Sequence, residues 1–466
     1  MREFKFEKFV SGIIKKNINL KVRLFLFAGL LSSGFVFGQQ TSNKPEREQW
    51  FMDLGFGMFI HWSFDSQVGA VISHSMSGAS DDYLQRFVAE LPETFNPKKF
   101  DPDEWATLAK LAGMKYVVFT TKHHSGFCMW DTKTTGFNIM NTPFKRDAAK
   151  DIFDAFRKQG IAIGIYFSPE DFHLLYEKHI PVGRLQHPQH YPVNNPDLMK
   201  LDKAQIKELL TNYGKIDILF FDGPVEGLKE YAWQLQPDVV VTRGQMETPE
   251  QNLPNKPMPG PWEACFTMGT DWQYKPTNDP HKTGTEIIDM LIEIRAKGGN
   301  LLMNVGPKPD GEIQIEQESL LREVALWNLV NQESVHDIRP WEIIKEGDIW
   351  FTKAKDKNTV YAFVPAGEAW KYGTRRDFVF KTLAGNNQTK VSILGYASEL
   401  VEYKNGFDAS VYVTPTKLGL VISAVNGQRL YTNNQWPNRV VLKIENVKYQ
   451  PSDNTIVKSS TSDGAK

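Results

Sequence analysis

The chain has 466 residues, a length that predicts two or three domains, although α/β barrels also run long. Its formal net charge is -1 and no block of Lys or Arg forms a basic stripe, which argues against a nucleic-acid or anionic-membrane partner and favours a weakly charged ligand. Only two cysteines occur, Cys128 and Cys265, which excludes a disulfide framework; we expect both to be free and buried, with one possible bridge left open.

The N-terminus has the pattern of an export signal. Basic residues between Lys15 and Arg23 precede an apolar run from Leu24 to Phe37, and cleavage is expected before Gln39. The run is too short for a spanning helix and no other long apolar stretch follows. Residues 1–38 are therefore predicted to be a signal peptide of an exported, periplasmic or extracellular protein that has no membrane partner. The oligomeric state is not indicated.

From about Trp50 the chain repeats an amphipathic helix, a glycine and an apolar strand. In the clearest copy, Asp101 caps a helix that ends at Gly113, and a strand from Tyr116 to Thr121 follows. The other expected strands are 57–62, 161–167, 216–221, 239–241 and 301–305. Six or seven α/β units are visible, and such alternation predicts a parallel sheet.

The contents of the strand ends favour a closed (β/α)8-like TIM barrel over a doubly wound sheet. All carboxyl ends of a barrel's strands meet at one mouth, where catalytic groups gather. No Gly-x-Gly-x-x-Gly follows the first strand, as a dinucleotide-binding fold would require. The expected strand ends carry His61, Lys122, His123, His124, Ser168, Asp222, Arg243 and Glu263.

Short, alternating, β-branched runs follow Trp341, from 349–351 to 440–444, and predict a C-terminal antiparallel β-sandwich. The resulting division is a barrel at 39–340, a sandwich at 341–450 and a disordered Ser/Asp/Lys-rich tail at 451–466. The loops at 67–94 and 173–195 are expected to be exposed and to shape the leaving-group side of the mouth.

The absence of other catalytic motifs leaves catalysis by carboxylates as the expected chemistry. The chain has no Gly-x-Ser-x-Gly elbow, no phosphate-binding glycine loop and no His-x-His or His-Glu-x-x-His zinc motif, so no metal and no cofactor are predicted. Glycoside cleavage needs a carboxylate nucleophile or base and a second carboxyl as proton donor. Asp222, at the end of an apolar run before Gly223, is the candidate nucleophile. Glu263 is its candidate partner, with Glu247 and Glu226 as competitors.

At these residues the chain resembles the retaining α-L-fucosidases of glycoside hydrolase family 29. The resemblance covers roughly residues 50 to 340 and keeps the family's order. It rests on Phe59-Ile-His-Trp62, Tyr116-Val-Val-Phe-Thr-Thr-Lys-His-His-Ser-Gly-Phe127, Gly164-Ile-Tyr-Phe-Ser168, Phe221-Asp-Gly223, Trp262-Glu-Ala-Cys265 and Lys297-Gly-Gly-Asn-Leu-Leu-Met-Asn-Val-Gly-Pro307.

The resemblance implies an exo-acting glycosidase with a barrel and a β-sandwich, and a fucosylated glycan as substrate. It implies that Asp222 is the nucleophile and, at the family's least uniform position, that Glu263 is the acid/base. Around them it implies a sugar-binding set of His61, His123, His124, Tyr166 and Arg243. We also expect Trp62, Trp262 and Phe59 to bind the substrate. Phe59 lies two residues before His61, on the same side of the strand, and is expected to face the C6 methyl group.

Three rival functions stay open at this point. A fucose-binding protein could keep the pocket and lack catalysis, although the intact Asp222 argues against this. A metal-dependent hydrolase could use the histidines at the mouth. A related α-glycosidase could prefer galactosides, since galactose and fucose share hydroxyl orientation apart from C6.

Overall fold

A parallel sheet of seven strands forms the first part of the protein in the computed structural model, which describes residues 40–183, 187–427 and 438–452. Its order is β5-β4-β3-β2-β1-β7-β6, so β1 pairs with both β2 and β7, as in a barrel. The strands are β1 (Phe56–Ile60), β2 (Tyr116–Lys122), β3 (Ala162–Phe167), β4 (Ile218–Phe221), β5 (Val240–Val241), β6 (Glu263–Thr267) and β7 (Asn300–Val305). The predicted barrel is confirmed, with seven strands in the described residues.

Segment 247–251 runs parallel to β6 along the edge that β7 leaves free. Single bridges join Glu247 to Trp262 and Glu250 to Cys265, and the Cys265 amide donates to the carbonyl of Pro249 at 3.0 Å. This segment has no regular strand of its own, yet it satisfies backbone groups of β6. It also brings Glu250 beside Cys265.

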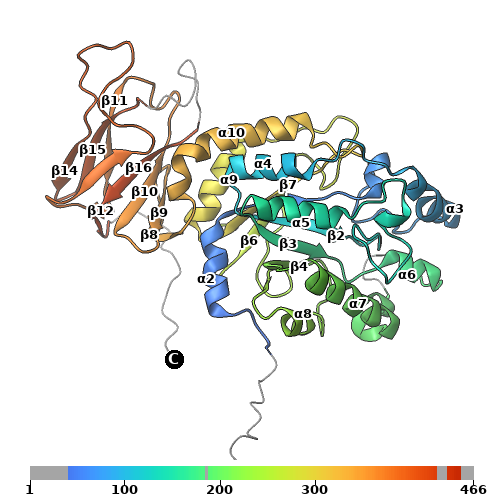
Figure 1. Ribbon diagram of the computed structural model, residues 1–466. Helices are drawn as coiled ribbons and strands as arrows, with labels where there is room; N and C mark the ends of the chain where they lie inside the picture. Colours follow the sequence, from blue (N-terminus) through green and yellow to red (C-terminus); the bar gives the residue numbers. More distant parts are fainter. Residues whose placement is uncertain (1–39, 184–186, 428–437, 453–466) are drawn as a thin grey trace, which may run out of the picture. The chain divides into compact units, whose positions relative to one another are not determined.

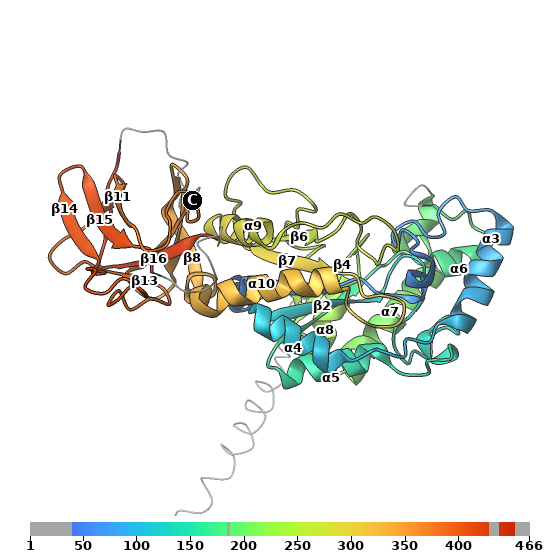
Figure 2. The same cartoon turned by 90° about the horizontal axis from the view of Figure 1, so that it is seen from above.

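Helices surround the strands. Their bounds are α2 (Pro45–Leu54), α3 (Asp81–Gln85), α4 (Pro102–Ala112), α5 (Ala148–Lys158), α6 (Phe172–Glu177), α7 (Pro196–Asn212), α8 (Lys229–Leu235), α9 (Gly284–Ala296) and α10 (Ile315–Asn331). Figure 1 shows α10, α4 and α5 on one side of the strands and α7 and α8 on the other. Figure 2 shows α4 beside both α10 and α5, in agreement with the contacts between these helices.

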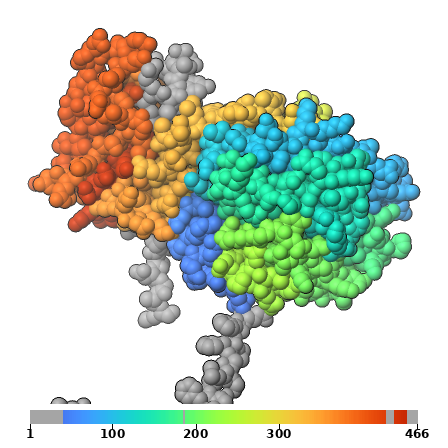
Figure 3. Space-filling model, in the orientation of Figure 1, coloured from blue at the N-terminus to red at the C-terminus, as the bar shows by residue number. Residues whose placement is uncertain are grey.

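The predicted limits of α4 are confirmed by its caps. The side chain of Asp101 accepts hydrogen bonds from the amides of Asp103 and Glu104, and Gly113 ends the helix with a φ of 82°. Its buried face packs over the sheet. Its opposite face is turned to the outside of the molecule. In Figure 3 the helices α4, α5 and α8 form a continuous blue, teal and green outer surface.

Antiparallel sheets follow the barrel, as predicted. The strands are β8 (Ile338–Glu346), β9 (Ile349–Ala354), β10 (Thr359–Val364), β11 (Arg375–Phe380), β12 (Leu383–Ala384), β13 (Lys390–Ile393), β14 (Tyr412–Thr416), β15 (Gly419–Val425), β16 (Val440–Glu445) and β17 (Lys448–Tyr449). They form sheets of five (β13-β16-β10-β9-β8), three (β11-β15-β14) and two strands (β12-β17). One buried apolar cluster lies among them.

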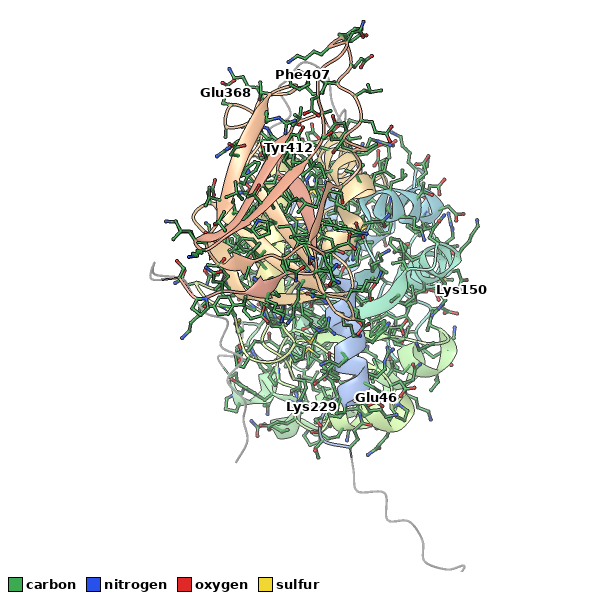
Figure 4. The ribbon with its side chains drawn as sticks, turned by 90° about the vertical axis from the view of Figure 1, so that its left-hand side faces the viewer. Glu46, Lys150, Lys229, Glu368, Phe407 and Tyr412 are labelled. Atoms are coloured by element: carbon green, nitrogen blue, oxygen red, sulfur yellow. The ribbon has the colours of Figure 1, made fainter. Side chains whose placement is uncertain are left out.

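Exposed side chains cover the outside of both parts. Figure 4 labels Glu46 on α2, Lys150 on α5 and Lys229 on α8, together with Phe407 and Tyr412 in the part that contains the antiparallel sheets. Cys128 and Cys265 are free and buried, which confirms that expectation. The predicted signal peptide and nearly all of the predicted tail lie outside the described residues. Within the described ranges, every helix is too short or too polar to cross a bilayer.

Candidate active site

The carboxyl ends of β1 to β5 deliver polar side chains to one mouth, as the strand-end argument predicted. His61 follows β1, His123 follows β2, Tyr166 lies near the end of β3, Asp222 follows β4 and Arg243 follows β5. Residues two apart on a strand share a face, which carries these side chains to the inside of the barrel.

Gly223 lets the chain turn away immediately after Asp222. Its φ is 144°, a conformation that side-chain-bearing residues rarely adopt, and a Cβ there would lie 3.2 Å from Pro169. Asp222 therefore stands at the tip of β4, with 19 % of its side chain exposed.

A cavity of about 140 Å³ lies at this mouth. Asp222 lies among its walls and contacts three basic or hydroxyl-bearing side chains. The cavity is lined by Phe59, His61, Ser73, His123, Tyr166, Phe220, Asp222, Arg243, Glu250, Cys265 and Trp272. Aromatic rings with a few converging polar groups are the usual lining of a small-molecule site.

Both oxygens of Asp222 have partners. Tyr166 Oη donates to Oδ2 at 2.6 Å, and Arg243 Nη1 donates to Oδ1 at 3.2 Å. His124 Nε2 lies 3.5 Å from Oδ2, on the side away from the cavity. A carboxylate that accepts these contacts is stabilised in its ionised form.

Arg243 connects Asp222 to a second carboxylate. Its Nη2 atom donates to Glu250 Oε2 at 3.0 Å, while its Nη1 atom holds Asp222. The guanidinium also lies 4.6 Å from the centre of the Phe220 ring. Asp222 and Glu250 therefore flank one guanidinium in one cavity, and 44 % of the Glu250 side chain is exposed at its rim.

His61 is held as a neutral acceptor. Asn304 Nδ2 donates to the carbonyl of Trp272 at 2.6 Å, so Asn304 Oδ1 faces His61 Nδ1, also at 2.6 Å, and accepts its proton. Burial lowers the pKa of His61 to about 3, against the hydrogen bond with Asn304 that favours the charged form. Its Nε2 atom is left to accept a hydrogen bond from a ligand hydroxyl.

Glu263 does not line this cavity, and the expectation that it ends a strand is wrong. It opens β6 instead of ending it, is fully buried, and lies one layer below Cys265 inside the barrel. Tyr116 Oη donates to its Oε2 at 2.5 Å. Burial raises the pKa of Glu263 to about 7, against the hydrogen bond from Tyr116.

Two predicted tryptophans and one histidine also lie away from the cavity. Trp62 points outward from β1, where its Nε1 donates to the carbonyl of Lys308 at 3.1 Å. Trp262 lies under Gly299 at the amino end of β6. His124 is buried behind Asp222 and does not line the cavity. The alternation of side chains along a strand explains all three positions, since each precedes or follows an inward-facing residue.

Of the other two candidate acids, Glu247 lies beside Trp262 and Glu226 follows β4 on an exposed turn, and neither lines the cavity. The residues that sequence reasoning missed are Ser73, Glu250, Cys265 and Trp272. Trp272 follows the true carboxyl end of β6, so a correct strand assignment would have pointed to it. Burial raises the pKa of the Cys265 thiol, which makes it a neutral, weakly polar neighbour.

One group of described residues could hold a metal ion. Ligand atoms of His123, His124 and Asp222 lie within 4.8 Å of one another. Arg243 already donates to the same carboxylate, and a cation there would face its guanidinium. This donor set therefore fits a metal poorly, and the absence of a cofactor stays a prediction.

Comparisons with known proteins agree with this geometry. The model of the family described as α-L-fucosidase matches residues 33–333. The tissue α-L-fucosidase of Mus musculus is 30% identical over 410 residues, which cover 78% of this chain and 86% of that protein. An α-L-fucosidase of Dictyostelium discoideum is 27% identical over 82% of this chain and 90% of that protein.

Solved structures share the fold. α-L-Fucosidase isoenzyme 1 from Paenibacillus thiaminolyticus is 28% identical, with a TM-score of 0.66 over 87% of this chain and 99% of that one. An α-L-fucosidase of Bacteroides thetaiotaomicron, described as a trapped covalent intermediate, is 23% identical with a TM-score of 0.66 over 88% of this chain and 98% of that one. Given the family match and the carboxylate-bearing mouth, the chain belongs to the α-L-fucosidases of glycoside hydrolase family 29 and is a glycosidase.

Proposed function

We propose that this protein is a retaining, exo-acting α-L-fucosidase that hydrolyses terminal α-L-fucosides of glycans through a covalent glycosyl-enzyme. The observation that carries the proposal is the position of Asp222 in a small cavity, with Tyr166 and Arg243 on its two oxygens. These contacts keep the carboxylate ionised and fix its direction, which a nucleophile requires.

Asp222 attacks the anomeric carbon, and the bond to the leaving oxygen breaks. In the second half-reaction water attacks the same carbon, and the electron pair of the ester bond returns to Asp222. Tyr166 Oη and Arg243 Nη1 then stabilise the returning negative charge. The Bacteroides neighbour, described as a trapped covalent intermediate, is consistent with such a two-step route in the family.

Glu250 is the acid/base in this proposal. It is the second carboxylate among the residues that line the cavity, and it shares Arg243 with Asp222. Proton donation requires the contact with Arg243 Nη2 to open as the leaving group enters. Once Glu250 has given up its proton it is a carboxylate, the form that Arg243 Nη2 binds. In the second half-reaction this carboxylate acts as the base that activates water.

The remaining walls suit a deoxy sugar. His61 Nε2 accepts from a hydroxyl group, and His123 offers a further polar contact. Phe59, Phe220 and Cys265 give an apolar patch for the C6 methyl group. A C6 hydroxyl there would lose its hydrogen bonds to water, so the patch favours fucosides over galactosides.

The size of the cavity supports exo action. A volume of about 140 Å³ is small for any ligand larger than one sugar ring. The rest of the glycan then lies outside, on the side of Glu250 and Ser73. The proposed substrate is a glycan with terminal fucose, whatever the sugar that carries it.

Replacing Asp222 tests the function directly. Asp222→Gly should lower turnover of an aryl α-L-fucoside by at least about 10⁴-fold, and added azide should restore product as the fucosyl azide of opposite anomeric configuration. Asp238→Asn, which removes a surface partner of Lys44, is the matched control and should keep full activity. Near-normal turnover by Asp222→Gly would overturn the proposal, and fucose binding without turnover by the wild type would favour a silent binding protein.

We also propose that the protein is exported to the periplasm or beyond the cell. The support is the basic and apolar pattern of residues 15–38, which lies outside the described residues. Mass spectrometry of the protein secreted by its host tests this proposal. A mature chain that begins at Gln39 is expected, and an uncleaved chain inside the cell would contradict it.

A further inference from the structure

Four buried side chains lie behind the nucleophile, on the side away from the cavity. They are His124, Ser168, Glu170 and His190, of which His124 and Ser168 are fully buried and Glu170 is 1% exposed. His190 comes from a short helical turn at 188–190, in a loop for which the sequence predicted exposure. The structure buries it completely, which corrects that expectation.

The tautomer of His124 follows from its neighbour Ser168. The Ser168 hydroxyl lies 3.1 Å from the carbonyl of Glu170, which can only accept, so the hydroxyl donates to it. Ser168 Oγ is also 2.5 Å from His124 Nδ1 and must accept there. His124 therefore carries a hydrogen on Nδ1.

His190 also carries a hydrogen on one identifiable nitrogen. Its Nε2 atom lies 2.9 Å from the carbonyl oxygen of Pro181, which accepts, so Nε2 carries the hydrogen. Both imidazoles thus have one nitrogen committed as a donor to a neutral oxygen.

The other nitrogen of each ring faces a carboxylate. His124 Nε2 lies 3.5 Å from Asp222 Oδ2, and His190 Nδ1 lies 3.2 Å from Glu170 Oε1. A lone pair at either position would repel the carboxylate at close range in a buried site, whereas a proton would be attracted. Glu170 Oε2 also lies 3.6 Å from His124 Nδ1, where it favours a positive charge on that ring.

We propose that Glu170 and His190 are positioning residues that hold His124 as an imidazolium with its Nε2–H directed at Asp222. The proposal rests on the proposed role of Asp222 as nucleophile. In this arrangement the Nε2–H of His124 faces Asp222 Oδ2, and His190 Nδ1 lies beside Glu170 Oε1. His124 keeps its proton throughout the reaction.

Other charges nearby are already paired. Arg243 holds the other oxygen of Asp222, and Lys122 lies 3.3 Å from Asp171 and 3.1 Å from Asp202. The rings of His123 and His124 are nearly perpendicular, with centres 4.6 Å apart. These groups do not take the place of Glu170 beside His124 Nδ1.

The arrangement acts most strongly in the second half-reaction. When the bond between the anomeric carbon and Asp222 breaks, its electron pair returns to the carboxylate, and His124 Nε2–H stabilises Oδ2 as the charge develops. If Glu170 is replaced by a neutral residue, His124 loses the negative charge beside its Nδ1 atom, and its imidazolium form is less stable. Asp222 then loses part of the stabilisation of its returning negative charge and becomes a poorer leaving group. Hydrolysis of the glycosyl-enzyme should slow more than its formation.

The experiment compares Glu170→Gln and His190→Gln with the wild-type enzyme. With an aryl α-L-fucoside, each variant should hydrolyse its glycosyl-enzyme roughly 10- to 100-fold more slowly, the range found when the hydrogen-bond partner of a metal-binding histidine is removed. A burst of aryl alcohol should precede slow turnover. The double variant should lose little more than either single variant, since both act through His124.

Glu177→Gln is the matched control. It removes the carboxylate 3.7 Å from His173 Nε2 in the neighbouring helix α6, a His–Glu pair that does not contact Asp222. Its kinetics should be unchanged. The inhibition constant for free fucose should also be unchanged in Glu170→Gln and His190→Gln, because neither residue lines the cavity.

Each outcome decides the matter. Wild-type hydrolysis of the glycosyl-enzyme by Glu170→Gln, or equal losses in hydrolysis and fucose binding, would overturn the positioning role. If Glu170→Gln does not fold, Ser168→Ala removes the acceptor of His124 Nδ1 together with the hydrogen bond to the Glu170 carbonyl, and it should show the same step-specific loss. Wild-type kinetics in that variant would also overturn the positioning role. No turnover by the wild type would instead refute the proposed function.

Discussion

Tyr166 donates a hydrogen bond of 2.6 Å from its Oη atom to Oδ2 of Asp222. The phenol is fixed by ring contacts on two sides: its ring stacks on Phe220, with centres 5.6 Å apart, and on His123, with centres 4.9 Å apart. Because these contacts do not involve the hydroxyl, the hydrogen bond can be removed without disturbing the ring.

Tyr166→Phe should therefore lower turnover while keeping the fold. A hydrogen bond to a charged group contributes about 1.5–3 kcal/mol, which corresponds to roughly a 10- to 100-fold loss in the rate that depends on it. Steady-state kinetics with an aryl α-L-fucoside and thermal unfolding would measure both effects. Unchanged turnover would show that the hydroxyl does not assist Asp222.

The activity of variants towards substrates with different leaving groups distinguishes Glu250 from Glu263 as the acid/base. Glu250→Ala should lose most activity against natural fucosides and least against aryl fucosides with acidic leaving groups, which need no proton. Azide should restore turnover of the activated substrate by replacing the base. Similar losses for both substrate types would argue against Glu250 as the acid/base.

Glu263→Gln is the comparison for that experiment. The amide keeps an acceptor for the Tyr116 hydroxyl and lies outside the cavity, so turnover of both substrate types should stay within about threefold of wild type. A selective loss against natural fucosides would return the acid/base role to Glu263.

Glu263 also predicts a pH dependence of stability. Its pKa in the folded chain is raised to about 7 from the ordinary value of 4.5, so between these pH values the folded chain holds a proton that the unfolded chain has released. The free energy of unfolding should fall as pH rises through this window, by at most about 3 kcal/mol from this group. Below pH 4.5 the group should have no effect.

Thermal unfolding of Glu263→Gln between pH 4.5 and 8 measures this contribution. The variant carries no buried charge, so its stability relative to wild type should increase towards pH 8. Glu46→Gln, on the exposed side of α2, should show no such trend. A constant difference between Glu263→Gln and wild type across the range would mean that Glu263 does not titrate there.

The apolar patch predicts the preference among sugars. Wild-type kcat/KM for an aryl α-L-fucoside should exceed that for the corresponding α-L-galactoside by roughly 100-fold, the limit for an apolar site that rejects an added hydroxyl. Phe59→Ser should reduce this ratio by relieving the unpaired hydroxyl. A ratio near one in the wild type would place the C6 group elsewhere.

Most of the barrel and the position of Asp222 were predictable from the sequence. Apolar runs between helical segments fix where buried strands lie, and the carboxyl ends of parallel strands must share an edge, so His61, His123, Asp222 and Arg243 converge. Glu263 departs from this pattern, because the apolar residues of its strand follow it instead of preceding it. Glu263 is therefore the first residue of β6, and the apolar residues that follow it form the rest of the strand.

Two further site features had no local signal. Glu250 reaches the cavity because segment 247–251 pairs with β6, a contact between irregular backbone and a strand that no periodicity reports. His190 is buried beside Glu170 from a loop rich in proline and polar residues, a composition that predicts exposure. Both depend on tertiary contacts that local patterns do not contain.

The small cavity around Asp222, if it takes one sugar ring as proposed, has a consequence for how a polymer would be degraded. Under the proposed exo action one terminal ring enters at a time, so the effective substrate concentration is the concentration of chain ends. Equal masses of long and short chains should then differ in rate by the ratio of their chain ends. Each hydrolysed bond exposes at most one new terminal residue for the next round of hydrolysis. An enzyme that breaks chains internally would therefore accelerate this one without touching it.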